Sequence, residues 1–120
     1  MGALSEAVRN RLEQGRTAFN RGAYFRAHEL WEDAWRELDG VEKIALQGLI
    51  QIAAGLHHLE QRHSRPAAGL LRKGLAKVSQ RAFAPPVDLR VEALARDVAR
   101  LLADLDTPGA KLPDPGRLKL

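Results

Sequence analysis

The chain has 120 residues, of which 45% are hydrophobic and 28% charged, and this length suits one domain whose core needs no disulfide or structural metal. It contains no cysteine, which excludes thiol catalysis, cysteine-based zinc sites and disulfide frameworks, and which suits a reducing compartment. The 19 basic and 15 acidic residues give a net charge of +4 but are interspersed, so we expect a mixed solvated surface rather than a nucleic-acid interface.

The sequence shows no sign of a membrane segment or a secretory signal. Its first residues contain no apolar run, and the apolar stretch Ile44–Leu56 is too short to span a bilayer and carries two glutamines. We therefore expect a cytoplasmic protein without a membrane partner.

Apolar residues recur at helical spacing, and no run alternates with the period of a strand. The first helix is expected over about residues 5–19, with Ser5 as its N-cap and with Gly22 or Asn20 free to take a left-handed conformation after it. The second helix is expected over about 24–38, followed by a break at Asp39-Gly40.

The third helix, expected over about 41–61, is the central one because it is apolar on nearly every face. After a short loop, a fourth helix is expected over about 66–81, with Pro66 at its first position. Its outward face is expected to carry the basic residues Arg72, Lys73, Lys77 and Arg81.

A fifth helix is expected over about 88–105, with Asp88 as its N-cap. We expect its apolar stripe to be buried in the bundle, and a homodimer through this stripe is the alternative. Short loops make consecutive helices antiparallel neighbours. The sequence therefore predicts an all-α fold, a compact bundle of about five helices built from antiparallel helical hairpins and weakly similar to tetratricopeptide repeats.

The domain organisation follows from these elements. Residues 1–106 are expected to form a single helical domain, and the Pro-rich residues 107–120 an extended or disordered tail that Leu112 or Leu118 would pin down.

Polar side chains form a stripe on the central helix, because Gln47, Gln51 and His58 fall close together at about 100° per residue. A buried amide without partners costs about 1–3 kcal/mol. The stripe should therefore face other polar groups, which we expect in the segment His28–Trp35 of the second helix.

Within that segment, His28 and Glu32 are four residues apart and project side by side. A histidine and a carboxylate so placed can share a divalent metal ion, with His58 as a further ligand and Gln51 behind it as a hydrogen-bond donor. Glu29 would supply a spare carboxylate as a base for hydrolysis. The candidate pocket for a metal or a small polar ligand comprises His28, Glu29, Glu32, Trp35, Gln47, Gln51 and His58, with His28, Glu32 and His58 as the metal ligands.

Packing offers an alternative explanation for the same residues. Glu32 would then accept a hydrogen bond from His58 or from a glutamine amide and fix the second helix against the third. In that case the protein would be a non-enzymatic interaction module that binds a protein partner. Trp31 and Trp35 are both expected in the core, because two tryptophans four residues apart on an amphipathic helix usually pack there. Trp35 shares the side of His28 and Glu32, so lining a pocket is the alternative for it.

Two blocks of sequence, FNRGAYFRAHELWEDAW and GLIQIAAGLHHLEQ, carry a family resemblance. They resemble the bacterial and archaeal domain-of-unknown-function 309 family, whose pattern is close to F-N-x-G-x-[YF]-[YF]-x-A-H-E-x-x-E-x-x-W and then G-L-I-Q-x-A-x-x-x-x-H. The match covers roughly Phe19–Val78, and His57 stands where members often carry Tyr. The resemblance implies a small α-helical bundle, and the family's biochemical function is not established.

Overall fold

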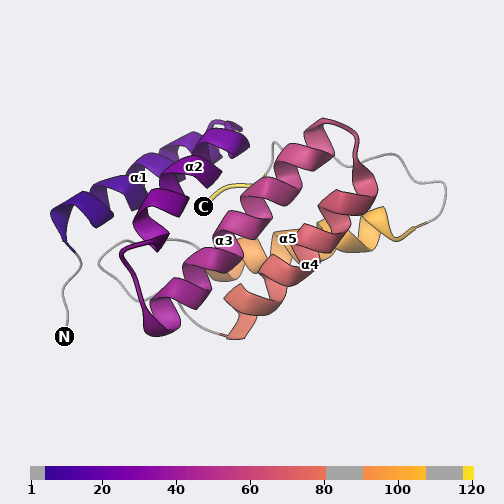
Figure 1. Cartoon of the computed structure of the whole chain (residues 1–120). Helices are drawn as coiled ribbons and strands as arrows, with labels where there is room; N and C mark the ends of the chain where they lie inside the picture. The colour runs from indigo at the N-terminus through magenta and orange to yellow at the C-terminus, as the bar shows by residue number, and fades with distance from the viewer. Residues whose placement is uncertain (1–4, 81–90, 108–117) are drawn as a thin grey trace.

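The structure is a computed structural model that describes residues 5–80, 91–107 and 118–120, and the regular structure within these ranges is entirely helical. In chain order the helices are α1 (Glu6–Asn20), α2 (Tyr24–Trp35), α3 (Gly40–Glu60), α4 (Ser64–Gln80) and α5 (Val91–Leu105). Figure 1 shows α3 running through the middle of the molecule, with α1 and α2 towards one end and α4 along the other side. The expected all-α bundle is confirmed.

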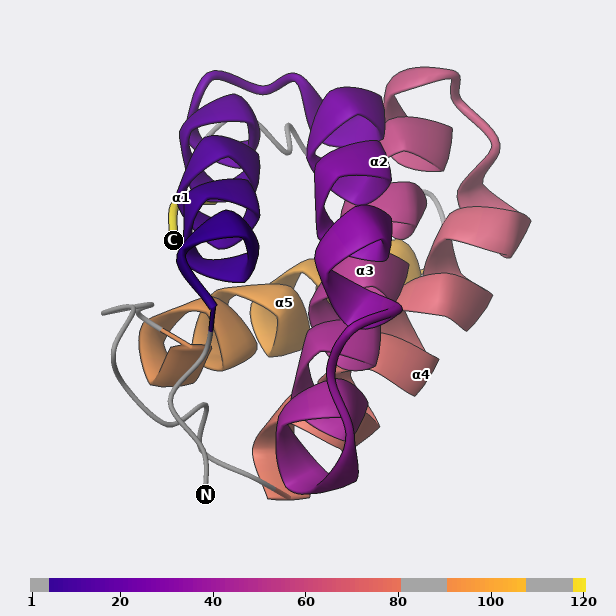
Figure 2. The same ribbon diagram turned by 60° about the vertical axis from the view of Figure 1, so that its left-hand side comes forward.

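Each helix packs mainly against the next one in the chain: α1 against α2, α2 against α3, α3 against α4, and α4 against α5. Figure 2 shows α1 and α2 side by side, with α5 lying across the bundle at an angle to both. Short connections between amphipathic helices favour such antiparallel hairpins. Ten residues of α3 are buried. A helix that is apolar on nearly every face must be covered by its neighbours, which explains the central position of α3.

Both ends of α1 follow the expected signals. The Ser5 hydroxyl accepts a hydrogen bond from the backbone N–H of Val8, at 3.1 Å, and so acts as the N-cap. Gly22 has a φ of +82°, and the backbone after α1 turns back to bond the carbonyls of Phe19 and Ala18. Gly22, rather than Asn20, is therefore the left-handed residue that ends this helix.

The second helix ends at Trp35, three residues before the predicted end. The N–H groups of Glu37 and Leu38 bond the carbonyls three residues earlier, at 3.0 and 3.2 Å. Such bonds tighten the chain after a helix end and satisfy its last carbonyls. Leu38 still reaches the core, where it is buried, which explains why its spacing resembled that of a helical residue.

The fourth helix begins at Ser64, so Pro66 is its third residue and not its first. The first bond of the helix joins the N–H of Ala67 to the carbonyl of His63, at 3.1 Å. N–H groups earlier than this have no partner within a helix, so the missing N–H of Pro66 costs nothing there.

The expected N-cap Asp88 and the tail residue Leu112 lie outside the described residues.

Aromatic rings fill the contact between α1 and α2. The ring centroid of Phe19 lies 5.2 Å from that of Tyr24 and 5.7 Å from that of Trp31. Trp31 is fully buried, as predicted, and its Nε1 donates to the backbone carbonyl of Leu12 at 3.2 Å. Among the residues that the structure describes, no polar or charged residue is fully buried.

We also searched the described helices for a candidate membrane span and found none.

Candidate functional site

One face of α2 carries the first part of the candidate site. His28 and Glu32 are one helical turn apart, and the His28 Nε2 lies 3.5 Å from the Glu32 Oε1. The side chain of His28 is 23% exposed and that of Glu32 44% exposed. The structure therefore brings these two predicted residues together at a half-buried position, where solvent and small solutes reach the carboxylate.

Trp35 continues the same face of α2 and is half-buried. The ammonium Nζ of Lys43, on α3, lies 4.2 Å from the centroid of the Trp35 ring. A cation over an indole face is attracted by the negative potential of the ring. Lys43 was not among the predicted site residues, because a lysine near a helix start usually lies in solvent.

The stripe on α3 is present, and its three residues Gln47, Gln51 and His58 are half-buried. Gln51, however, bonds α4 and not α2, since its Oε1 accepts from the Nζ of Lys77 at 2.9 Å. Lys77 was predicted on the outward face of the fourth helix and is instead half-buried. Long lysine stems can lie along an apolar surface while the charged end reaches a polar group, which explains this difference.

All four histidines of the chain take part in a row of neighbouring rings at one end of α2 and α3. Phe25 lies between His28 and His57, with centroids 5.7 and 5.3 Å away. His57 is followed by His58 at 6.3 Å, and His58 by His63 at 5.9 Å. Phe25 is 52% exposed. Sequence analysis missed this row because His63 belongs to the turn after α3, which periodicity cannot place.

Three buried side-chain nitrogens in this region have no hydrogen-bond partner among the described residues: His28 Nδ1, Trp35 Nε1 and His58 Nδ1. All three belong to residues that the sequence assigned to the candidate pocket. A buried donor or acceptor without a partner costs about 1–3 kcal/mol, and such groups are uncommon in native proteins. The hydrogen-bonding capacity of this region is therefore incompletely used by the protein itself.

The predicted metal trio is assembled only in part. His28 and Glu32 meet, but within the described ranges no group of three or more His, Asp or Glu side chains is arranged to hold a metal ion, so His58 does not join them. Glu29 is exposed and lies 3.6 Å from the guanidinium of Arg26, also on α2. Glu29 is therefore not part of the half-buried face of α2 that carries His28 and Glu32.

The hydrogen-bond network expected under the packing alternative is also incomplete. Glu32 pairs with His28. Within the described residues it makes no hydrogen bond to His58 or to a glutamine amide. The interaction-module alternative, with its protein partner, stays a prediction.

These features define a class of protein: a small bundle of helical hairpins with a half-buried polar stripe on its central helix. The family model described as domain of unknown function (DUF309) matches residues 12–70, which contain α2, α3 and the two blocks that carry the resemblance. The chain belongs to this family, as its sequence predicted. No curated protein and no solved structure gives a match to the chain.

Proposed function

We propose that the protein binds a small polar ligand at the half-buried face of α2 that carries His28, Glu32 and Trp35, next to the polar stripe of α3. A divalent metal ion with its bound water is one such ligand. The observation that carries the proposal is the pair of buried nitrogens without partners on this face of α2, His28 Nδ1 and Trp35 Nε1. A bound ligand would give these nitrogens the partners that the protein does not supply.

The chemistry of the side chains limits the kind of ligand. The indole N–H of Trp35 can only donate, and the ammonium of Lys43 adds a positive charge beside it. Glu32 accepts when ionised, and each imidazole can donate or accept. This combination favours a ligand with an oxygen acceptor on one side and a donor or positive charge on the other. Because His28 and Glu32 are the only preassembled pair among the three predicted metal ligands, a metal ion here would keep much of its water.

The proposal concerns binding and not hydrolysis. Glu29, the carboxylate expected to act as a base, is exposed and paired with Arg26. A general base must lie within hydrogen-bond reach of the proton that it removes. Glu29 therefore serves best as a control residue, because it has the same charge and lies on the same helix as Glu32.

Thermal melts of the purified protein test the proposal, with Zn²⁺, Mn²⁺, Ni²⁺, phosphate or acetate added singly and with a chelator as a further arm. A ligand at a hundred times its Kd adds about 2.7 kcal/mol to the free energy of unfolding, which raises the Tm by several degrees. We expect at least one probe to do so. Glu32→Gln and His28→Ala should remove the shift, since each takes away a contact.

Glu29→Gln is the matched control and should leave the shift unchanged. Glu32→Gln itself should cost less than about 1 kcal/mol of stability, because the ion pair is partly exposed. A shift of equal size in both glutamine variants would contradict the proposed position, and no shift with any probe would contradict binding of these ligands.

A further inference from the structure

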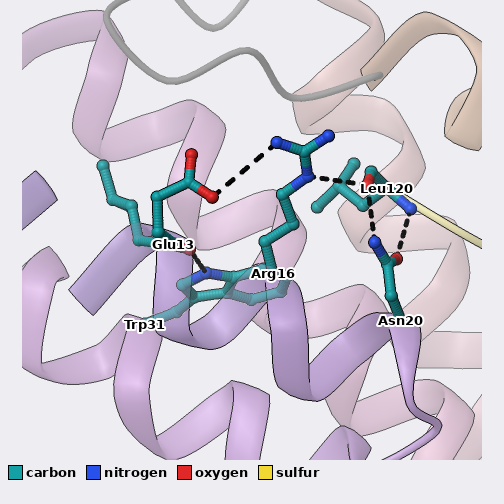
Figure 3. Close-up of polar contacts among 6 residues, drawn as sticks. Glu13, Arg16, Asn20, Trp31 and Leu120 are labelled. Carbon is teal, nitrogen blue, oxygen red and sulfur yellow. Dashed lines mark hydrogen bonds and ion pairs between the residues drawn. The ribbon is translucent and has the colours of Figure 1, made fainter. Parts of the chain in front are cut away.

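The two tryptophans of α2 lie four residues apart and differ in how their indole N–H groups are used. The Nε1 of Trp31 donates to the backbone carbonyl of Leu12 at 3.2 Å (Figure 3). The Nε1 of Trp35 is buried and has no partner among the described residues. An indole N–H can only donate, so Trp35 offers a donor for which the described part of the protein supplies no acceptor.

Polar groups on the surface of α1 are paired more fully. The Asn20 amide donates from Nδ2 to the Leu120 carbonyl at 2.9 Å and accepts at Oδ1 from the Leu120 N–H at 2.6 Å (Figure 3). The Nε of Arg16 donates to the same carbonyl at 2.9 Å. Leu118 is buried, at 5% exposure, so the expected pinning of the tail by Leu118 is confirmed. Among the residues that the structure describes, the buried side-chain nitrogens without partners all belong to α2 and α3, so they are a local feature of this region.

The end of the α2 face that carries His28 and Glu32 offers acceptors. The Glu32 carboxylate lies 3.5 Å from the His28 Nε2, and its negative charge favours the neutral tautomer with the proton on this nitrogen. The buried Nδ1 of His28, which has no partner in the described ranges, is then an acceptor. Phe25 stacks on the His28 ring with centroids 5.7 Å apart and is 52% exposed, and the face of an aromatic ring attracts cations. This end therefore suits an ammonium group.

The end of the same face that carries Trp35 offers donors. The Trp35 Nε1 donates only, and the Nζ of Lys43 lies 4.2 Å from the centroid of the same ring. An ammonium has three donors and a full positive charge, and its hydrogen bonds to a carboxylate are about twice as strong as bonds between neutral groups. This end therefore suits a carboxylate. Glu32 and Trp35 are three residues apart, which places their Cβ atoms about 5–6 Å from each other, so one small molecule can reach both ends.

We propose that this face binds a small amino carboxylate, a zwitterion whose ammonium lies at the His28 end and whose carboxylate lies at the Trp35 end. The inference rests on the proposed function, because it assigns a chemical class to the ligand of the same site. A metal ion pairs with acceptors alone, and acetate pairs with donors alone. An amino carboxylate pairs with both ends, and so it gives partners to both buried nitrogens of this face.

Labelling the tryptophan indoles of the full chain with ¹⁵N tests the proposal, because the chain gives two indole signals, Trp31 and Trp35, which Trp35→Phe assigns. The probes are glycine, β-alanine and γ-aminobutyrate, with butyrate and butylamine as matched molecules that carry one charge each. We expect at least one amino carboxylate to move the Trp35 signal to saturation, with a Kd about tenfold or more below those of butyrate and butylamine. The Trp31 signal, whose N–H is bonded to Leu12, should not move.

Three variants each remove one charge. Lys43→Met should abolish the preference for the amino carboxylate over butylamine, because the ligand carboxylate loses its cation. Glu32→Gln should abolish the preference over butyrate, because the ligand ammonium loses its carboxylate. Glu29→Gln, on the same helix, is the matched control and should change neither preference.

The outcomes separate this inference from the proposed function. If acetate, phosphate or a metal ion moves the Trp35 signal but no amino carboxylate binds more tightly than butyrate and butylamine, the zwitterion is overturned and the proposed site stands. If none of these probes moves the Trp35 signal, both are contradicted. Equal movement of the Trp31 and Trp35 signals would also overturn the inference, because it would indicate binding without a specific site.

Discussion

Arg62 has a φ of +63°, which is a left-handed conformation. Among the described residues, every other residue with such a φ is a glycine. The N–H of Arg62 bonds the carbonyl of Leu59, and the N–H of His63 bonds that of His58, both at 2.9 Å. This pair of bonds is the Schellman motif, in which glycine is usual at the position of Arg62. The motif turns the chain back so that the rings of His58 and His63 become neighbours.

A glycine at this position should stabilise the fold. The left-handed conformation costs a residue with a side chain about 1–2 kcal/mol, and glycine adopts it freely. We expect Arg62→Gly to raise the free energy of unfolding by about 0.5–1 kcal/mol in urea titrations. Arg21→Gly is the matched control, because Arg21 follows α1 with an ordinary φ of −89°, and it should lower stability. A loss of stability in both variants would contradict this account of the Arg62 turn.

The sequence predicted some individual site residues and missed others for a physical reason. The pairing of His28 with Glu32 follows from four-residue spacing alone, and the burial of Trp31 from its apolar face. Lys77 and Phe25 were missed because periodicity indicates the direction of a Cα–Cβ bond and not where a long side chain ends. The partner of Gln51 depends on how α4 packs, and helical spacing contains no information on this.

At the scale of helices, α3 and α4 approach through glycines that leave their backbones in contact. A Cβ at Gly74 would lie 2.6 Å from the carbonyl oxygen of Gly48 and 2.7 Å from the Cγ1 of Ile52. The carbonyl belongs to a helical backbone and cannot move independently. This contact brings Lys77 within reach of Gln51 and so helps to build the polar stripe.

Gly74→Ala should therefore destabilise the protein, although alanine favours a helix by about 1 kcal/mol. Crowding in a packed interior costs about 1–3 kcal/mol, and we expect a net loss of about 1 kcal/mol or more. Gly69→Ala, on the same helix, is the control, since a Cβ there meets no atom within 4 Å. It should gain about 0.5–1 kcal/mol. Equal effects of the two substitutions in denaturant unfolding would contradict the close helix contact.

At the scale of the whole molecule, local patterns predicted the helices and their order but not the contact that joins the two ends of the sequence. Hairpin packing of consecutive helices follows from short loops. The docking of Leu120 on α1 does not, because Arg16 and Asn20 lie at the edge of an amphipathic helix and have the pattern of solvated residues. The sequence predicted that Leu112 or Leu118 would pin the tail, but it did not predict which helix the tail contacts.

Binding at the half-buried face of α2 is the central claim, and the nitrogen signals of the four imidazoles test it most directly. A ¹⁵N correlation spectrum of the histidine rings, recorded as one equivalent of Zn²⁺ or phosphate is added, should show its largest change at His28, whose Nδ1 atom is buried without a partner on the proposed face. His57 should change much less. Unchanged spectra, or equal changes at all four histidines, would contradict a specific site.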